Sequence, residues 1–414
     1  MGSARTQSTL LTFAEARQIV EECASRLSPT EPDTVSLLDA LGLVLAEGLC
    51  ADRDFPPFPR ATRDGYAVRA ADLASPSARL RLIGEIKAGG PLQEGLSIGS
   101  GEAAEIMTGA PVPSGADAVV MVEYTERNGK IVNVQRTVQP GENVVAPGSE
   151  ATRGSLMVAR GTRVTHTTIA VAAAVGRPEI AVCRRPKVAI LATGDELVDI
   201  NLPPRANEIR NSNSYSLAAQ VNQAGGEPMI LPVAPDSADE LALLLRKGLD
   251  ADLLLVTGGV SAGKYDLVEH VLASFEARFI FTGARIQPGK PVVFGEVMLR
   301  DRTTPFFGLP GNPVSTMVTF QLFAKPILDG LSGATPQPLP FAKAMLKSSF
   351  TTRTGLTRFL PASLGGVYDQ PEVELIRWQS SGDLMAVSRS NCYIVVPPER
   401  EAFATGEEVT ILLF

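Results

Sequence analysis

The stretch VTGGVSAGKYD contains glycine and lysine residues at the spacing of a phosphate-binding loop. Gly258, Gly263 and Lys264 match the pattern Gly-x4-Gly-Lys, in which backbone N–H groups hold phosphate oxygens. The pattern requires a Ser or Thr next, whose hydroxyl holds Mg²⁺, but Tyr265 and Asp266 follow instead. We therefore expect a phosphate-binding turn, not the loop of an ATPase, in which the Asp266 carboxylate replaces the missing hydroxyl.

Two further glycine-containing turns follow apolar runs elsewhere in the chain. Thr-Gly-Asp-Glu at residues 193–196 follows KVAILA, and Leu-Pro-Gly-Asn-Pro-Val-Ser at residues 309–315 follows PFFG. Glycine lets the backbone approach a phosphate, and a helix N-terminus supplies N–H donors. A single turn of this kind is more often ordinary chain structure, but three that converge on one sheet edge favour a binding site. The expected phosphate-binding residues are Thr193, Gly194, Asp195, Gly258, Gly259, Ser261 and Gly263.

Carboxylates accompany these turns. Asp195 and Glu196 lie in the turn that follows KVAILA, Asp236 follows the run PMILPV, and Asp266 lies two residues after Lys264. Mg²⁺ in proteins is held by a few carboxylates together with substrate phosphate oxygens, which suits this group, and we select Glu196, Asp236 and Asp266 as the candidate metal ligands. The alternative for each is a helix cap or a solvated side chain. With Lys264 and Lys290 to balance phosphate charge, the residues indicate a Mg²⁺-assisted enzyme acting on a phosphate or nucleotide ester.

Composition narrows the possible partners. The chain has 414 residues, is 44% hydrophobic and 20% charged, and carries a net charge of −7, which argues against a nucleic-acid or acidic-membrane surface. Four cysteines without CxxC spacing and only two histidines argue against a soft-metal site. No run of 18 apolar residues and no signal sequence is present, so we expect a cytoplasmic protein.

The pattern of apolar runs predicts a multi-domain α/β protein. Strand and helix patterns alternate between residues 183 and 330, which predicts a central doubly wound α/β domain with a mainly parallel sheet. Short runs broken by Gly and Pro predict a β-rich domain at 50–155 and a C-terminal β domain, a barrel or a sandwich, at 331–414. Residues 1–49 with 156–182 would form a helical or linker domain. It begins with a helix near 12–27, capped by Thr12 and Glu15, and continues with a second helix near 36–49.

Motifs in several parts of the chain together resemble the molybdopterin molybdenumtransferases, the enzymes that insert molybdenum in the last step of molybdenum-cofactor synthesis. The resemblance extends over nearly the whole chain. It rests on Asp64-Gly65-Tyr66-Ala67-Val68, Met107-Thr108-Gly109-Ala110-Pro111, Thr193-Gly194-Asp195-Glu196-Leu197, Gly258-Gly259-Val260-Ser261, Pro288-Gly289-Lys290-Pro291 and Leu309-Pro310-Gly311-Asn312-Pro313-Val314-Ser315. The related adenylyltransferases have a Gly-Gly-Thr-Gly turn and a single domain, so this chain is more similar to the transferases.

The resemblance implies a homodimer of four-domain subunits that converts adenylylated molybdopterin and molybdate, with Mg²⁺, to molybdenum cofactor and AMP. It leaves open a molybdopterin adenylyltransferase as a further partner. By the resemblance, the acidic residues of the cleft are Asp64, Glu196, Asp236 and Asp266, with Glu150 in a fifth acidic position. The molybdate-binding region corresponds to Lys290, Pro291, Ser315 and Arg358.

The chain departs from the family pattern in two places. Residues 59–63 read Pro-Arg-Ala-Thr-Arg where the family usually has Asp-Asn-Ser-Ala-Met, and Gln287 replaces a lysine that some members carry. Both changes bear on specificity and not on class. Two alternatives remain at this point: a non-catalytic dimeric scaffold, because a similar domain of gephyrin anchors receptor peptides, and insertion of tungstate in place of molybdate.

Overall fold

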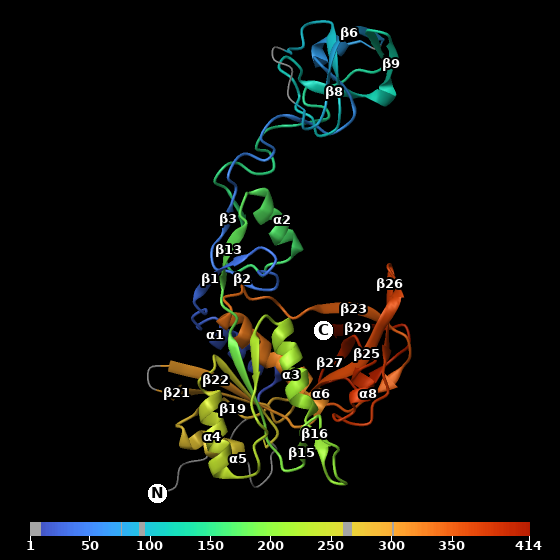
Figure 1. Ribbon diagram of the computed structural model, residues 1–414. Helices are drawn as coiled ribbons and strands as arrows, with labels where there is room; N and C mark the ends of the chain where they lie inside the picture. The colour runs from blue at the N-terminus through green and yellow to red at the C-terminus, as the bar shows by residue number, and fades with distance from the viewer. Residues whose placement is uncertain (1–9, 76, 91–95, 260–266, 300–301) are drawn as a thin grey trace. The chain divides into compact units, whose positions relative to one another are not determined.

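The chain forms two compact units (Figure 1). The computed structural model describes residues 10–414 apart from residues 76, 91–95, 260–266 and 300–301. The larger unit comprises Met1–Ala46, Gly161–Thr165 and Glu179–Phe414, and the inserted unit comprises Glu47–Arg160 and His166–Pro178. The backbone therefore passes between the units four times. The finer division into four domains stays a prediction.

A six-stranded sheet lies at the centre of the larger unit, as the alternating sequence pattern predicts. Its strand order is β17-β14-β18-β22-β21-β19, and the four strands from β17 to β22 run parallel. The strand β21 is antiparallel to both of its neighbours, which makes the sheet mixed at one edge. The strands span Lys187–Ala192 (β14), Glu227–Ile230 (β17), Leu253–Thr257 (β18), Arg278–Phe281 (β19), Val293–Leu299 (β21) and Arg302–Leu309 (β22).

Both faces of this sheet are covered by helices, because successive strand residues are apolar and point to opposite sides. Ile190 and Leu255 belong to a core that includes residues of the N-terminal helix, α3, α6 and α7, whereas Leu191 and Leu254 belong to a second core with α4 and α5. Figure 1 shows α4 and α5 together on one side of the sheet. The doubly wound arrangement is confirmed. The helices are α3 (Ser212–Gln223), α4 (Ala238–Gly248), α5 (Leu267–Ser274), α6 (Pro313–Thr319) and α7 (Lys325–Leu331).

The N-terminal region contains one of the two helices that we expected. Helix α1 (Phe13–Ala24) begins at the predicted capping box, in which Thr12 and Glu15 bond reciprocally. The prediction of a second helix near residues 36–49 is wrong. That stretch forms a turn and the strand β2 (Val44–Leu45), and Gly42 takes a left-handed φ of +79° that interrupts a helix. In the described part of the chain, no helix is long and apolar enough to cross a membrane.

The C-terminal region forms a closed five-stranded barrel, which decides between the barrel and the sandwich that the sequence left open. The strand order is β25-β26-β23-β29-β27, and β27 pairs back with β25. A sixth strand, β20 (Ile286–Gln287), comes from the α/β region and pairs in parallel with the start of β25. The barrel strands span Phe341–Leu346 (β23), Thr357–Val367 (β25), Gln370–Leu375 (β26), Cys392–Val396 (β27) and Glu408–Leu413 (β29).

The inserted unit is rich in β structure, as the short apolar runs predict. Its main sheet has the order β8-β5-β7-β6-β10-β9 and packs its apolar residues into two cores. Two short strands, β4 (Arg60–Ala61) and β11 (Val144–Val145), pair beside it. The strands of the main sheet span Gly65–Val68 (β5), Ala78–Ile86 (β6), Glu102–Ile106 (β7), Ala118–Met121 (β8), Thr125–Asn128 (β9) and Ile131–Val134 (β10).

Candidate active site

The three glycine-containing turns meet at one edge of the central sheet. They follow β14, β18 and β22, which are parallel neighbours, so their carboxyl ends lie side by side. The packing is close: a Cβ added to Gly258 would lie 2.4 Å from the carbonyl oxygen of Thr193, and one added to Gly311 would lie 3.5 Å from the Cα of Gly258. The φ of Gly258 is +90° as well. Only glycine satisfies both the contact and the backbone conformation at this position.

A side-chain amide joins two of these turns. Asn213, near the start of α3, donates from Nδ2 to Oγ1 of Thr257 (3.0 Å) and to the carbonyl oxygen of Gly311 (2.7 Å). A carbonyl oxygen only accepts, so this contact identifies the nitrogen end of the amide. The amide oxygen is buried and has no hydrogen-bond partner. Asn213 thus holds the turn after β18 against the turn after β22.

The turns line a cavity of about 1110 Å³. Its wall is built from the α/β stretches 193–197, 209–213, 257–259 and 310–313, the single residues Asp236, Leu267 and Pro291, and a short segment of the C-terminal region at 382–384. Asn312 links the two regions, because its Nδ2 donates to Oγ of Ser381 at 2.8 Å. The lining residues used below are Thr193, Gly194, Glu196, Arg210, Asn213, Asp236, Thr257, Gly258, Gly259, Pro291, Gly311 and Gly382.

The carboxylates predicted at this edge differ in what they contact. Glu196 and Asp236 line the cavity and are exposed. Asp195 accepts a hydrogen bond from the backbone N–H of Asp236 at 3.0 Å, so it ties together the segments that follow β14 and β17. The hydroxyl of Thr193 donates a long hydrogen bond, 3.5 Å, to Oδ1 of Asp236. Ser261, Gly263 and Asp266, with Lys264, lie outside the described residues.

Two carboxylates on the cavity wall suit Mg²⁺, which takes one or two carboxylates and completes its shell with substrate phosphate and water oxygens. Glu196 and Asp236 are the two that the cavity presents. Among the described residues, no group of three acidic, His or Cys side chains gathers as an all-protein metal site. The donor set therefore fits a metal that is shared with a bound phosphate.

The residues expected near molybdate lie on both sides of the junction between the α/β region and the barrel. Pairing of Gln287 with Arg358 places the loop that contains Lys290 next to the start of β25. The Nε of Arg358 donates to the carbonyl oxygen of Arg353 at 2.9 Å, and burial, with a smaller effect of the Arg353 charge, lowers the pKa of Arg358. Lys290 is exposed, and Ser315 is buried in α6.

The other two predicted carboxylates belong to the inserted unit. Oδ1 of Asp64 accepts hydrogen bonds from the backbone N–H (2.6 Å) and the hydroxyl (2.8 Å) of Thr108. Both bonds lower the pKa of Asp64, and the bond from the backbone N–H has the larger effect. Glu150 forms an ion pair with Arg60 at 3.1 Å. Arg60, one of the two arginines in the 59–63 stretch, therefore pairs with the carboxylate for which the resemblance suggests the fifth acidic position.

Sequence reasoning missed three contributors to the cavity. Arg210 and Asn213 were seen only as polar residues before and within the helix that begins at Ser212, and nothing local marks them as site residues. Gly382 comes from the barrel region, which the strand-end argument does not include. The one usable signal for Asn213 was its place in the first turn of a predicted helix that follows a glycine turn.

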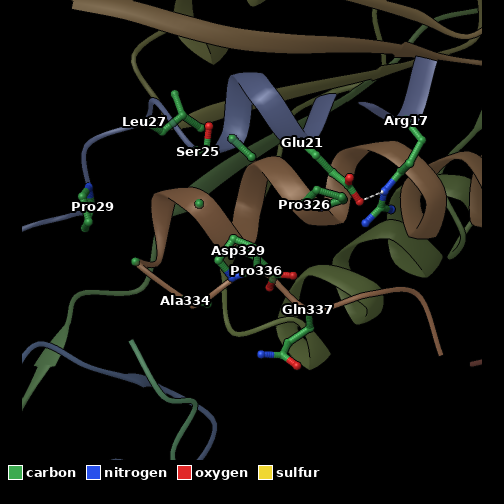
Figure 2. Close-up of a pocket in the computed structure, with 13 residues that line it drawn as sticks. Arg17, Glu21, Ser25, Leu27, Pro29, Pro326, Asp329, Ala334, Pro336 and Gln337 are labelled. Atoms are coloured by element: carbon green, nitrogen blue, oxygen red, sulfur yellow. Dashed lines mark hydrogen bonds and ion pairs between the residues drawn. The ribbon is translucent and has the colours of Figure 1, made fainter. Parts of the chain in front are cut away.

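A second, smaller cavity lies between α1 and α7 (Figure 2) and holds about 290 Å³. Each of its charged side chains already forms an ion pair. Arg17 and Glu21 form an ion pair at 2.6 Å, and Asp329 contacts Arg163 at 2.8 Å and Lys325 at 2.5 Å. Figure 2 shows the Arg17–Glu21 contact near Pro326. This cavity presents no convergent set of free polar groups, so the site lies in the larger one.

The fold and this site define a multi-domain α/β protein with a ligand cavity at the carboxyl edge of its parallel strands. Family models match residues 11–176 as the MoeA N-terminal region (domains I and II), 189–330 as a probable molybdopterin binding domain and 343–414 as the MoeA C-terminal region (domain IV). The chain therefore belongs to the MoeA family of molybdopterin molybdenumtransferases.

Individual relatives align with this chain over nearly its full length. The molybdopterin molybdenumtransferase of Bacillus subtilis is 35% identical over 395 residues, which cover 92% of this chain and 90% of the relative. That of a Nostoc species is 33% identical and covers 93% and 89%. The crystal structure of the molybdopterin biosynthesis moeA protein from Pyrococcus horikoshii superposes with a TM-score of 0.80 at 30% identity, covering 98% of this chain and 100% of that one.

Proposed function

We propose that the protein is a molybdopterin molybdenumtransferase that inserts molybdate into adenylylated molybdopterin, with Mg²⁺-dependent release of AMP. The observation that supports this most directly is the meeting of three glycine turns, Glu196 and Asp236 around one cavity. The turns suit phosphate groups and the carboxylates suit a phosphate-bound metal. A purely scaffolding role does not require carboxylates at this edge.

Catalysis would rest on positioning and electrostatics. Backbone N–H groups at Gly258 and Gly259 would hold the pyrophosphate, and Asn213 would keep the turns that carry them at a fixed separation. Mg²⁺ would be held by Glu196 and Asp236, with Asp266 as a further ligand, and would neutralise phosphate charge when bound. A carboxylate at the cavity wall would orient the attacking water, which cleaves the phosphoanhydride bond so that AMP leaves.

The oxyanion would bind at the junction of the α/β region with the barrel. Lys290, Pro291, Ser315 and Arg358 would form its pocket, and the burial of Arg358, which lowers its pKa from the ordinary value, accords with a guanidinium held out of bulk water. The sulfur ligands of molybdenum come from the substrate, so no cysteine is needed there. We further propose a cytoplasmic homodimer in which Asp64 and Glu150 complete the acidic set, with a molybdopterin adenylyltransferase as the supplier of the nucleotide.

The test supplies adenylylated molybdopterin, Mg²⁺ and either molybdate or tungstate, and measures AMP and metal-containing cofactor. We expect both products with molybdate, and loss of at least about tenfold in AMP release for Asp236→Asn, the change expected when one charged transition-state contact disappears. Asp239→Asn, in the first turn of α4, is the matched control and should be silent. A folded wild-type protein that releases no AMP with either oxyanion overturns the proposal.

A further inference from the structure

Arg210 is the only cationic side chain among the described residues that line the large cavity. The other charged groups there are the carboxylates of Glu196 and Asp236. A pyrophosphate in the same cavity adds further negative charge. Arg210 is therefore placed to supply positive charge to that pyrophosphate, in addition to the proposed Mg²⁺ and the N–H donors of the glycine turns.

The guanidinium of Arg210 is held in place without being neutralised. Its Nε donates to the backbone carbonyl oxygens of Ile200 and Leu202, both at 3.1 Å. Among the described residues, no carboxylate forms an ion pair with Arg210. The neighbouring Arg205 differs, because it pairs with Glu208 at 3.8 Å. Contacts to neutral carbonyls leave the full charge of Arg210 and its two terminal nitrogens available to a ligand.

The position of Arg210 relative to the site is set by local strand pairing. The strand β16 (Ile209–Arg210) pairs in parallel with β15 (Leu197–Val198), and the N–H of Ile209 donates to the carbonyl oxygen of Glu196 at 2.8 Å. The residue after Arg210 is the N-cap of α3. Arg210 is thus attached on one side to the first glycine turn and on the other to the helix that carries Asn213.

We propose that Arg210 binds a phosphate group of the nucleotide substrate through its two terminal nitrogens. A planar guanidinium fork matches two phosphate oxygens, and anchoring of its Nε reduces the side-chain freedom that binding would otherwise remove. The inference rests on the proposed function, because it names a residue for the pyrophosphate of that substrate. It assigns Arg210 a binding role and no proton transfer.

Calorimetric titration with inorganic pyrophosphate in the presence of Mg²⁺ tests the contact directly. We expect Arg210→Gln to raise the Kd about tenfold, and Arg210→Lys, which keeps the charge but not the fork, to raise it by less. Arg205→Gln is the matched control from the same loop and should bind as the wild type does. Unchanged affinity in folded Arg210→Gln, or no binding of pyrophosphate by the wild type, overturns the inference.

Kinetics separate this inference from the proposed function. With adenylylated molybdopterin, Arg210→Gln should raise KM about tenfold and change kcat by less than about threefold, because the phosphate is held before and during reaction. A merely structural role would lower kcat and the thermal unfolding midpoint together. Absence of AMP release by the wild type would count against the proposed function alone, since pyrophosphate binding is measured independently.

Discussion

The side-chain amide of Asn213 holds the carbonyl oxygen of Gly311 at 2.7 Å while the same nitrogen contacts the hydroxyl of Thr257. Removing this amide in Asn213→Ala should release the two turns from each other. We expect kcat/KM for AMP release to fall at least about tenfold, with a loss of about 1–2 kcal/mol in stability for two neutral hydrogen bonds. Asn222→Ala, exposed on the same helix, is the control. Equal activity of Asn213→Ala and Asn222→Ala would show that Asn213 does not position the turns.

Gly258 is constrained both by its left-handed backbone and by the carbonyl oxygen of Thr193, and the two effects are separable. Gly355 has a similar φ of +96° but nothing within 4 Å of an added Cβ. Gly355→Ala should therefore cost about 1–2 kcal/mol from backbone strain alone. Gly258→Ala should lower the thermal unfolding midpoint further and weaken pyrophosphate binding. Equal midpoints would show that the 2.4 Å contact is relieved without cost.

The backbone N–H and the hydroxyl of Thr108 both lower the pKa of Asp64, and Thr108→Val removes only the hydroxyl, which has the smaller effect. We therefore expect the variant to move the Asp64 pKa part of the way up toward its ordinary value of 3.8, observed by NMR titration of the carboxyl carbon. Because the folded pKa is the depressed one, the stabilisation is present above the unfolded pKa. It is lost as pH falls through the folded pKa, which places the window below pH 3.8. Thr125→Val, whose hydroxyl donates to Val122, should leave the Asp64 titration unchanged.

Asp266 lies outside the described residues, and its metal role is a prediction from the sequence. Asp266→Asn keeps the shape of the side chain but removes its charge. AMP release should fall at least about tenfold, and added Mg²⁺ should partly restore it. Asn caps a helix as well as Asp does, so normal turnover at limiting Mg²⁺ would identify Asp266 as a helix cap only.

The sequence predicted the elements of the α/β region well because its signals are local and strong. Each continuous apolar strand arises within a few residues, and so does the capping box at Thr12 that begins the N-terminal helix. The helix predicted near residues 36–49 does not form, because the apolar residues there suit a helix but Gly42 turns the chain. Local propensity yields to tertiary packing in such short segments.

The parts of the site that the sequence did not predict depend on contacts between residues far apart in the chain. The pairing of Gln287 with Arg358 spans 71 residues, and nothing near either residue indicates the other. Asn213 reaches Gly311 across 98 residues. The carbonyl oxygens that anchor Arg210 come from an irregular loop, for which neither apolar period nor turn type is informative. Turn residues were predictable, but the side chains that join the turns were not.

The packing of α1 (Phe13–Ala24) against α7 (Lys325–Leu331) sets the order in which the chain can fold during synthesis. About 300 residues separate the two helices, which is about 15–60 s of translation at typical rates. The apolar face of α1, with Ala16 and Val20, must wait that long for its partner, whereas most of the inserted unit is complete once Arg160 has emerged. Helix α1, made early, therefore completes its packing only after nearly the whole α/β region has been synthesised.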